Sequence, residues 1–359
     1  MQLRIPGPTP CPPEVLKALG KQMIDHRGKE FGEIITRITA NLKTLFQTKN
    51  DLFILSSSGS GGMESAVVNM LSPSDKVLSV AIGVFGERFA EIARTYGANV
   101  IPLNFEYGKA ADPDEIRKAL HADPAIKAVL VTHNETSTGV TNDMAAISKV
   151  IREFDKLILV DSISGLGSLD LPVDTLGLDV VIAGSQKGWM VPPGLSFASV
   201  SEKAWKAHAV AKIPRFYFDY TKAKKYLADA QTPWTPAISV YFGLDVSTKA
   251  MVAEGVASIA QRHAKVAEFT RKELKERGLT IFADEKYASN VVTSVKADEK
   301  LSVPKLRQIL RDEHKVIIAG GQGKLKGKIF RIGHMGWVSK EDMKEVLQAL
   351  DKALPKARE

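Results

Sequence analysis

A lysine follows an apolar stretch that we predict to be a buried strand. Residues 179–184 read DVVIAG, and Lys187 comes shortly afterwards in AGSQKGW, between a glutamine and a glycine. Lysine normally lies on a solvated surface, where its ammonium group keeps its water. In a pocket, a lysine with a lowered pKa can act as a nucleophile and form a Schiff base with an aldehyde. On this stretch alone, a surface lysine at a strand end and a nucleophile are both open.

An aspartate closes a second apolar stretch. In LILVDSISGLGS, residues 157–168, Asp161 stands at the end of a predicted strand. An isolated buried carboxylate costs free energy unless it is paired, so a fixed cation or a protonated ring nitrogen would suit it. The alternative is a structural aspartate that accepts hydrogen bonds from the backbone at Ser162 and Ser164.

A serine- and glycine-rich segment follows the first predicted strand of this region and opens a helix. It reads SSSGSGGMESAVVNM over residues 56–70. Small residues let the backbone approach an anion closely, and free N–H groups at a helix N-terminus would bind phosphate together with serine hydroxyls. The segment has neither the ending of a Walker loop nor the glycine spacing of a dinucleotide-binding turn. The alternative is a flexible turn with a serine helix cap.

Two further segments carry polar residues that could meet a ligand. VTHNETSTGV, residues 131–140, ends a predicted strand in the polar run from His133 to Thr136, which could contact a ligand or build a hydrogen-bonded loop. RIGHMG places Arg331 at or beside a short strand, where its planar fork could hold a carboxylate. A surface arginine is the alternative for Arg331.

The first three features together match the needs of one cofactor, pyridoxal 5′-phosphate. Lys187 can bond the C4′ carbon, Asp161 can stabilise the pyridinium nitrogen, and a serine-glycine loop can hold the phosphate. The order and spacing of these features are more specific than any one of them. We therefore predict a pyridoxal-phosphate enzyme without a metal site.

Alternating strands and helices over residues 50–200 would position these side chains. The predicted strands are near-continuously apolar, as expected when helices cover both faces of a mostly parallel sheet. They span 51–55, 76–81, 99–103, 127–133, 157–161, 179–184 and 195–200, with helical patterns at 85–97, 112–120 and 142–154. The predicted fold class is α/β, in which ligands gather at the carboxyl ends of the strands.

The character of the chain changes after residue 201. A helical tract at about 239–277 is interrupted by Gly255 and could be one helix or two, and the strands and helices beyond it indicate a smaller α+β domain. The glycine-rich residues 320–327 lack a strand–loop–helix context and indicate a hairpin-like connection. We predict an N-terminal arm over 1–20, a large cofactor-binding domain over 21–238 and a small domain over 239–359.

Composition and charge limit the classes of function. The 359 residues carry a formal net charge of +8, with basic residues scattered among acidic ones. The net positive charge is therefore better explained by attraction of small anionic substrates than by nucleic-acid binding. The single Cys11 excludes an intrachain disulfide framework, and no stretch resembles a membrane span or a signal peptide. We expect a cytoplasmic protein.

In its motifs the sequence resembles the class V aminotransferases, which are fold-type I pyridoxal-phosphate enzymes. The likeness is strongest to their alanine–glyoxylate and serine–pyruvate aminotransferase group. LDVVIAGSQKGWMVPPGLSFA, residues 178–198, is similar to the family's lysine signature along its whole length. In the family's order over nearly the full chain, the likeness also covers PGPTPCPPEV, FQTKN, SGSGGMES, VTHNETSTGV, VDSISGLG, TPWTPAIS and RIGHMG. It implies a mostly parallel seven-stranded sheet sandwiched by helices, plus a smaller α+β domain.

The resemblance implies a role for each matching residue. Lys187 would hold the cofactor as a Schiff base and move a proton between Cα and C4′, and Asp161 would keep the pyridine nitrogen protonated. Arg331 would hold the α-carboxylate of the substrate. The remaining contacts would be Gln186 to the phosphate, Thr136 to the ring oxygen, and Ser58, Gly59 and Ser60 as the phosphate-binding loop.

One implied role falls on a neighbouring subunit, because the family's active sites lie at the interface of homodimers. Thr235, in TPWTPAIS, would reach the phosphate held by the other subunit, with Thr232 or Trp234 as the alternative contact. The segment DHRGKEF, with His26 and Arg27, resembles an N-terminal segment of bacterial and archaeal relatives from which no role follows.

Two positions depart from the family's pattern. The residue that stacks on the cofactor ring is often tryptophan, whereas IGVFGER supplies Phe85, whose face is smaller. Ser60 stands where some relatives have histidine, so substrate contacts at this position do not carry over.

The function that the resemblance implies is transamination from alanine or serine to glyoxylate or pyruvate. Another aminotransferase with aspartate or a different donor, or a lyase of the same fold, is the alternative. A cysteine desulfurase needs a mobile nucleophilic cysteine late in the chain, and the only thiol, Cys11, lies near the start. Lys187, Asp161 and Arg331 together disfavour a non-catalytic subunit, and nucleic-acid binding is the least supported function.

Overall fold

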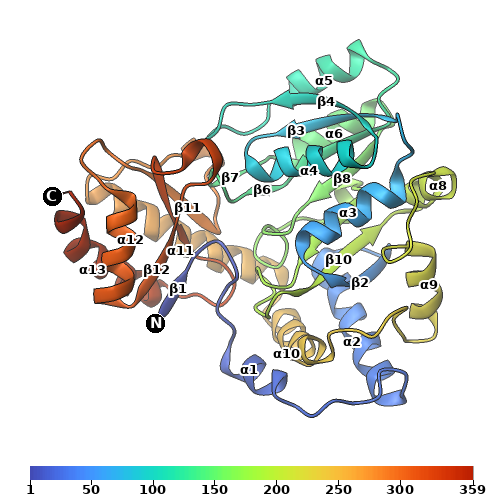
Figure 1. Ribbon diagram of the computed structural model, residues 1–359, viewed down its shortest axis with the longest axis horizontal. Helices are drawn as coiled ribbons and strands as arrows, with labels where there is room; N and C mark the ends of the chain where they lie inside the picture. Colours follow the sequence, from blue (N-terminus) through green and yellow to red (C-terminus); the bar gives the residue numbers. More distant parts are fainter. Residues whose placement is uncertain (359) are drawn as a thin grey trace.

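The computed structural model describes residues 1–358 and contains a large and a small sheet, each covered by helices (Figure 1). The large sheet has seven strands in the order β2–β10–β9–β8–β5–β3–β4. In it, β10 runs antiparallel to β2 and β9, and the other neighbouring pairs are parallel. The bounds are β2 (Asp51–Ser57), β3 (Lys76–Ala81), β4 (Asn99–Asn104), β5 (Ala128–Thr132), β8 (Leu157–Asp161), β9 (Val180–Gly184) and β10 (Gly194–Val200). The predicted α/β sheet is confirmed.

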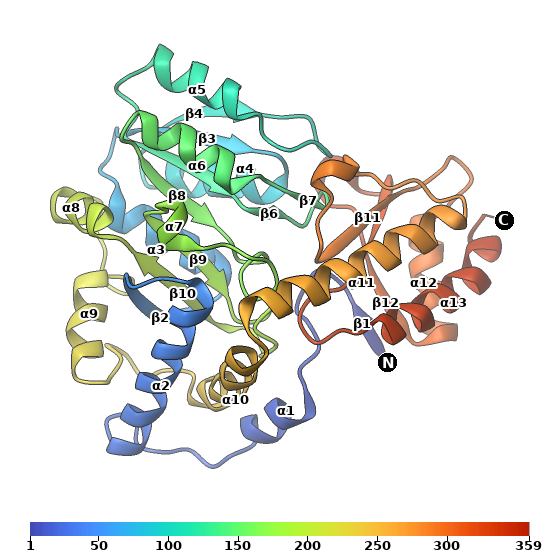
Figure 2. The same cartoon turned by 180° about the vertical axis from the view of Figure 1, so that it is seen from behind.

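Alternate side chains of the central strands face two different helical layers. In β5, Val129 and Val131 pack with one set of helices, and Ala128 and Leu130 pack with the other. The first layer contains α2 (Lys29–Phe46), α5 (Pro113–Ala122), α6 (Met144–Glu153) and α10 (Ile238–Glu254); the second contains α3 (Gly59–Met70), α4 (Val84–Thr95), α8 (Glu202–Val210) and α9 (Tyr220–Ala228). Figure 2 shows α6 on the face opposite to that on which Figure 1 shows α3 and α4. Covering of both faces explains the near-continuous apolar strands.

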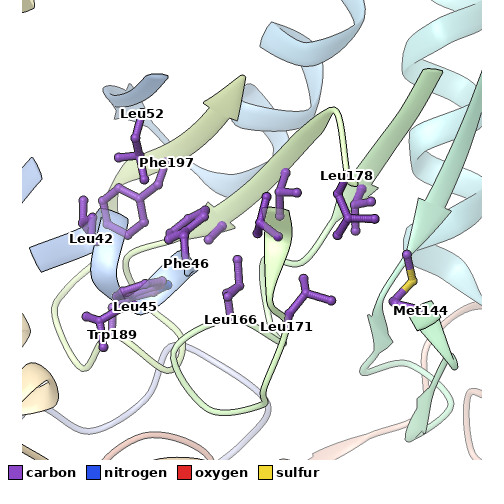
Figure 3. Packing of buried hydrophobic residues seen from close by; sticks show 14 of the residues in the cluster. Leu42, Leu45, Phe46, Leu52, Met144, Leu166, Leu171, Leu178, Trp189 and Phe197 are labelled. Carbon is purple, nitrogen blue, oxygen red and sulfur yellow. The ribbon is translucent and has the colours of Figure 1, made fainter. Parts of the chain in front are cut away.

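An aromatic cluster on the α2 side anchors the chain just after β9. Trp189 is fully buried, and its ring centroid lies 5.6 Å from that of Phe46 and 5.1 Å from that of Phe197 (Figure 3). Phe46 comes from the end of α2 and Phe197 from β10. Because close packing restricts side-chain movement, this cluster fixes the turn at residues 185–190 against the sheet.

The small sheet combines both ends of the chain. Its order is β1–β12–β13–β11, with β1 parallel to β12 and Leu3 opposite Ile317. Figure 1 shows β1 in blue among the orange and red C-terminal elements. The bounds are β1 (Gln2–Arg4), β11 (Val292–Lys296), β12 (Val316–Gly320) and β13 (Ile329–Gly333), and the sheet packs with α11 (Val256–Glu276), α12 (Val303–His314) and α13 (Lys340–Ala357). The predicted small α+β unit is confirmed, and the short 3-10 helix η2 (Gly323–Leu325) connects the antiparallel strands β12 and β13.

Gly255 separates two helices, which decides between the alternatives for residues 239–277. Its φ of +81° lies in the region that favours glycine, and α10 ends before it while α11 begins after it. Helix α10 packs against α2 and α1 (Pro13–Leu19), whereas α11 packs against α13. The division at residues 1–20, 21–238 and 239–359 stays a prediction. Across residues 1–358, no helix has both the length and the apolar character needed to cross a bilayer.

Candidate active site

A cavity of about 120 Å³ lies at the carboxyl ends of β8 and β9. All residues for which the sequence implied a role line it, except Arg331 and Thr235. The lining consists of Ser58, Gly59, Ser60, Met63, Phe85, Arg88, Asn134, Thr136, Asp161, Ile163, Ser164, Gln186 and Lys187. The chain therefore brings together side chains that are up to 129 residues apart in the sequence, from Ser58 to Lys187.

Lys187 projects into this cavity from the turn that follows β9. Its Nζ donates a 2.7 Å hydrogen bond to the carbonyl oxygen of Pro6. Burial lowers the pKa of Lys187 to about 8; nearby Arg331 and Arg88 also lower it, and Asp161 opposes the shift. The lysine is therefore not a surface residue at a strand end, and a large fraction of its amine is neutral near pH 8.

Asp161 is buried at the last position of β8, facing the same cavity. Its Oδ1 accepts a 2.9 Å hydrogen bond from the backbone N–H of Ile163. Burial raises the pKa of Asp161 to about 7, nearby Glu135 raises it further, and the Ile163 bond and Lys187 lower it. The backbone bonds to Ser162 and Ser164 that the structural alternative required are not made, because Ile163 takes that place and the Ser162 N–H donates to Ile182. Burial without a full set of partners leaves this carboxyl able to pair with a cation.

The serine-glycine segment forms the start of α3 at the cavity. Ser58 is the N-cap residue, and its side chain does not cap the helix. The first N–H groups of a helix have no partner within that helix, so they remain available to an anion. A Cβ at Gly59 would lie 2.7 Å from Ile163 Cδ1, and one at Gly62 would lie 2.6 Å from Ile182 Cγ2. Glycine at these positions lets the start of α3 lie directly against the strand ends that carry Asp161 and Lys187.

Gln186 contributes an unpaired polar atom to the same wall. Its Oε1 is buried without a hydrogen-bond partner among the described residues. A buried amide oxygen without a partner costs free energy, which a ligand that donates a hydrogen bond to it would recover.

Phe85 is positioned by a buried carboxylate. Glu135 lies in β6 (Asn134–Glu135), which pairs with β7 (Val140–Thr141). Its Oε2 accepts hydrogen bonds from the N–H groups of Phe85 at 2.9 Å and Gly86 at 3.2 Å, at the start of α4. Burial raises the pKa of Glu135, and its bonds to Ser137 and to these N–H groups oppose the shift. Glu135 thus caps α4 and sets the position of the Phe85 ring in the cavity.

Arg88 lines the cavity and was not foreseen. Its guanidinium carbon lies 4.8 Å from the centroid of the Phe85 ring, and its Nη1 lies 3.4 Å from Ser60 Oγ. Its position three residues after Phe85 on one helix was the signal in the sequence, because residues with that spacing share a helix face.

Arg331 is buried on β13 and is not among the residues that line the cavity. Its Nε donates to the carbonyl of Gly320 at 2.9 Å, and its Nη1 donates to the carbonyl of Thr136 at 2.9 Å and to Gln322 Oε1 at 3.2 Å. Burial lowers the pKa of Arg331 to about 10, and Glu135 opposes the shift. All three acceptors are neutral. Gln322 was not foreseen as a neighbour of this arginine.

The segment around Thr235 lies outside the cavity of this chain. Thr235 is exposed, Thr232 Oγ1 donates to the carbonyl of Trp234, and Trp234 Nε1 donates to the carbonyl of Tyr217. Arg27, from the segment without an assigned role, donates from Nη1 to the carbonyl of Thr232 at 2.6 Å. The structure therefore joins residues 25–31 to the segment that carries Thr235.

Comparisons with known proteins match nearly the full chain. The family model described as aminotransferase class V matches residues 3–339. A protein named soluble hydrogenase 42 kDa subunit, from Anabaena cylindrica, is 43% identical over 99% of this chain and 93% of its own length. A serine–glyoxylate aminotransferase of Methylorubrum extorquens is 35% identical over 93% of this chain and 86% of its own length. A crystal structure of an alanine–glyoxylate aminotransferase from Nostoc superposes with a TM-score of 0.95 at 30% identity, covering 98% of this chain and 94% of that one.

Proposed function

This chain belongs to the class V aminotransferase family, and from that premise we propose that it transfers the amino group of alanine or serine to glyoxylate or pyruvate. The family consists of pyridoxal-phosphate enzymes. The observation that carries the proposal is a single cavity lined by a lysine of lowered pKa, a buried carboxyl and the start of a helix.

The cavity residues fit pyridoxal phosphate by their chemistry. The N–H groups and serines at 58–60 suit a phosphate, and Gln186 would donate to it from its amide NH2 group. Phe85 presents a ring to stack on, and Thr136 carries a hydroxyl on the same wall. When bound, the cofactor supplies an electron sink for negative charge that develops on the substrate Cα.

Lys187 would anchor the cofactor covalently and act as the base of the reaction. Its Nζ would take the proton from the substrate Cα and return it at C4′. A pKa of about 8 suits both directions, because the amine accepts a proton readily and also gives it up near neutral pH.

Asp161 would hold a proton on the ring nitrogen. A cationic ring nitrogen beside a buried carboxyl stabilises its ionised form, so the raised pKa of Asp161 would fall again when the two are paired. The carboxylate then maintains the positive charge on which the electron sink depends.

Arg331 would bind the α-carboxylate of the amino acid and of the 2-oxo acid. The guanidinium of Arg331 has no carboxylate partner among the described residues, and its hydrogen bonds engage Nε and Nη1 only. Nη2 is therefore free to donate to a substrate carboxylate, and the neutral acceptors fix the plane of the guanidinium.

We also propose a homodimer whose active sites lie at the subunit interface. Exposed aromatic residues support it: Phe216 is 66% exposed and Tyr217 is 45% exposed, and both stack on Trp234. Solvent-exposed aromatic clusters of this kind mark interfaces. Thr235 beside them would contact the phosphate in the other subunit. Light scattering of the purified protein tests the dimer.

Two finer proposals concern the location of the protein in the cell and its binding partners. We propose a cytoplasmic location, supported by a chain whose only cysteine, Cys11, is unpaired. We propose that it binds neither nucleic acid nor membranes, since its basic residues are interspersed with acidic ones. Subcellular fractionation and a salt-dependent DNA-binding assay test these statements.

The decisive experiment adds pyridoxal phosphate to the purified protein and follows near-visible absorbance. We expect an absorbance band that disappears on borohydride reduction. The reduced cofactor should then be found covalently attached to Lys187. A panel of alanine, serine and aspartate against glyoxylate, pyruvate and 2-oxoglutarate then identifies the substrate pair. No cofactor band would contradict the proposal, and sulfide release from cysteine would favour the lyase alternative.

A further inference from the structure

The N-terminal segment 5–9 crosses from the small sheet to the turn that carries Lys187. On one side it continues β1, and a Cβ at Gly333 in β13 would lie 2.2 Å from the carbonyl oxygen of Ile5. On the other side, Thr9 donates from its N–H to the carbonyl of Gln186 at 3.0 Å and from Oγ1 to the carbonyl of Lys187 at 2.8 Å. The segment is therefore held at both ends, between the small sheet and the turn that carries Lys187.

The tip of the Lys187 side chain lies against this segment. Nζ donates to the carbonyl oxygen of Pro6 at 2.7 Å. A Cβ at Gly7 would lie 2.6 Å from Nζ and 2.7 Å from Cδ of the lysine. Gly7 also has a φ of +134°, which few residues other than glycine adopt. The space that the lysine occupies thus exists because residue 7 has no side chain.

The carbonyl oxygen of Pro6 is the direct hydrogen-bond partner of the Lys187 amine. The charged groups that face the lysine come from other elements: Asp161 on β8 and Glu135 on β6 favour the ammonium form, and Arg331 on β13 and Arg88 on α4 oppose it. A carbonyl oxygen that accepts from an ammonium group favours the charged form. The Pro6 carbonyl therefore acts on both the position and the proton affinity of this amine.

We propose that the Pro6 carbonyl and Gly7 form a dock for the Lys187 amine in the stages when that amine is not bonded to the cofactor. The inference rests on the proposed function, in which the lysine is released during each turnover and must stay in reach of the substrate Cα. A free lysine side chain has several rotatable bonds, and holding it in one place preserves productive geometry. Pro6, Gly7 and Thr9 are positioning residues, because they act through Lys187.

The test uses the full chain without cofactor. Acetic anhydride labels neutral amines, so the extent of Lys187 labelling at a series of pH values, measured by peptide mass spectrometry, gives the midpoint of its titration. In Gly7→Ala the new methyl group displaces Nζ from Pro6. Loss of a hydrogen bond to a charged group then lowers the midpoint by about one pH unit.

Gly20→Ala is the matched control. Gly20 is exposed at the end of α1, its φ of −85° suits alanine, and a Cβ there would have only Lys17 O within 4 Å, at 3.7 Å. We expect its midpoint to equal that of the unaltered protein. Equal midpoints for Gly7→Ala and Gly20→Ala, with both proteins folded by circular dichroism, overturn the proposal.

Thr9 provides a second route if Gly7→Ala does not fold. Thr9→Val removes the hydroxyl that ties the segment to the lysine turn, and Thr9→Ser keeps it. We expect the midpoint to fall by about half a unit in Thr9→Val and to stay unchanged in Thr9→Ser. An unchanged midpoint in Thr9→Val overturns the dock. Labelling needs neither cofactor nor activity, so a failure of the proposed function would show separately, as missing cofactor absorbance in the unaltered protein.

Discussion

Arg331 Nη1 donates a 2.9 Å hydrogen bond to the carbonyl oxygen of Thr136. Arg331 belongs to β13 in the small sheet, and Thr136 lies in the cavity wall just after β6. One contact thus joins the proposed carboxylate clamp to the proposed cofactor cavity. A substrate bound by Arg331 would reach the cavity in an orientation that this bond helps to set.

Arg331→Lys tests the clamp. Lysine keeps the positive charge but loses the planar fork and the bonds that Arg331 makes through Nε and Nη1. We expect kcat/KM for every α-carboxylate donor to fall roughly 100-fold, mostly through KM. Steady-state kinetics with alanine and serine measure it, and cofactor absorbance should match that of the unaltered protein. A variant with the original KM would remove Arg331 from substrate binding.

Gln322→Glu tests the neutral environment of the clamp. The introduced carboxylate would form an ion pair with Arg331 Nη1 in place of the amide oxygen that accepts at 3.2 Å. It would compete with the substrate carboxylate, so we expect KM to rise about tenfold while kcat changes little. Gln322→Leu, which adds no charge, is the control and should have the smaller effect. If both variants behave alike, charge competition is not the cause.

Asp161→Asn tests the buried carboxyl in the cofactor-free protein. The pKa of Asp161 is raised from 3.8 to about 7, so between those values the folded state binds more protons than the unfolded state. The contribution of this group to stability therefore falls as pH rises from about 4 to about 7, by up to roughly 4 kcal/mol. Asparagine abolishes this dependence, so the difference in unfolding free energy between variant and unaltered protein should change with pH in that window. Urea unfolding at a series of pH values measures it, and a constant difference would contradict the raised pKa.

Asp161→Asn should also slow transamination. The amide still accepts from the Ile163 N–H but carries no charge to hold a proton on the ring nitrogen. We expect kcat to fall roughly 100- to 1,000-fold with cofactor still bound. A kcat within twofold of the original would reject the role proposed for Asp161.

Lys187→Ala tests the nucleophile and the base together. Without Nζ the protein cannot form the Schiff base that borohydride reduces to a stable bond. The proton transfer also loses its acid–base group, so we expect the rate to fall about 100- to 10,000-fold. Single-turnover absorbance measurements and mass spectrometry after borohydride treatment check both effects. Lys272→Ala, whose side chain is 72% exposed on α11, is the matched control.

The large sheet and most of the cavity could be predicted because their signals are local. Each strand is a short apolar run whose first and last residues are clear from the sequence. In a parallel sheet, the residues that follow the carboxyl ends of the strands lie at the same edge of the sheet. That reasoning, with the family resemblance, brought Lys187, Asp161 and Ser58 into one place, where the structure also has them. The catalytic and binding roles of these residues and the domain boundaries stay predictions.

The parts that were missed depend on contacts between distant segments. Pro6 meets Lys187 across 181 positions of the chain, and no periodicity in the sequence reports such a contact. Gln322 was missed for the same reason, since its relation to Arg331 follows from the pairing of β12 with β13. The pairing of β1 with β12 joins segments from opposite ends of the sequence, and β1 consists of three residues of which only Leu3 is apolar, too short a pattern to indicate a strand.

This pairing of β1 has a consequence for the order in which the protein can assemble during synthesis. Residues 2–4 leave the ribosome long before their partners at 316–318 are made. The large sheet, complete by residue 200, can form before that point. Residues 2–4 must therefore wait for residues 316–318 before they can pair, and Lys187 gains its contacts with Pro6 and Gly7 late in folding.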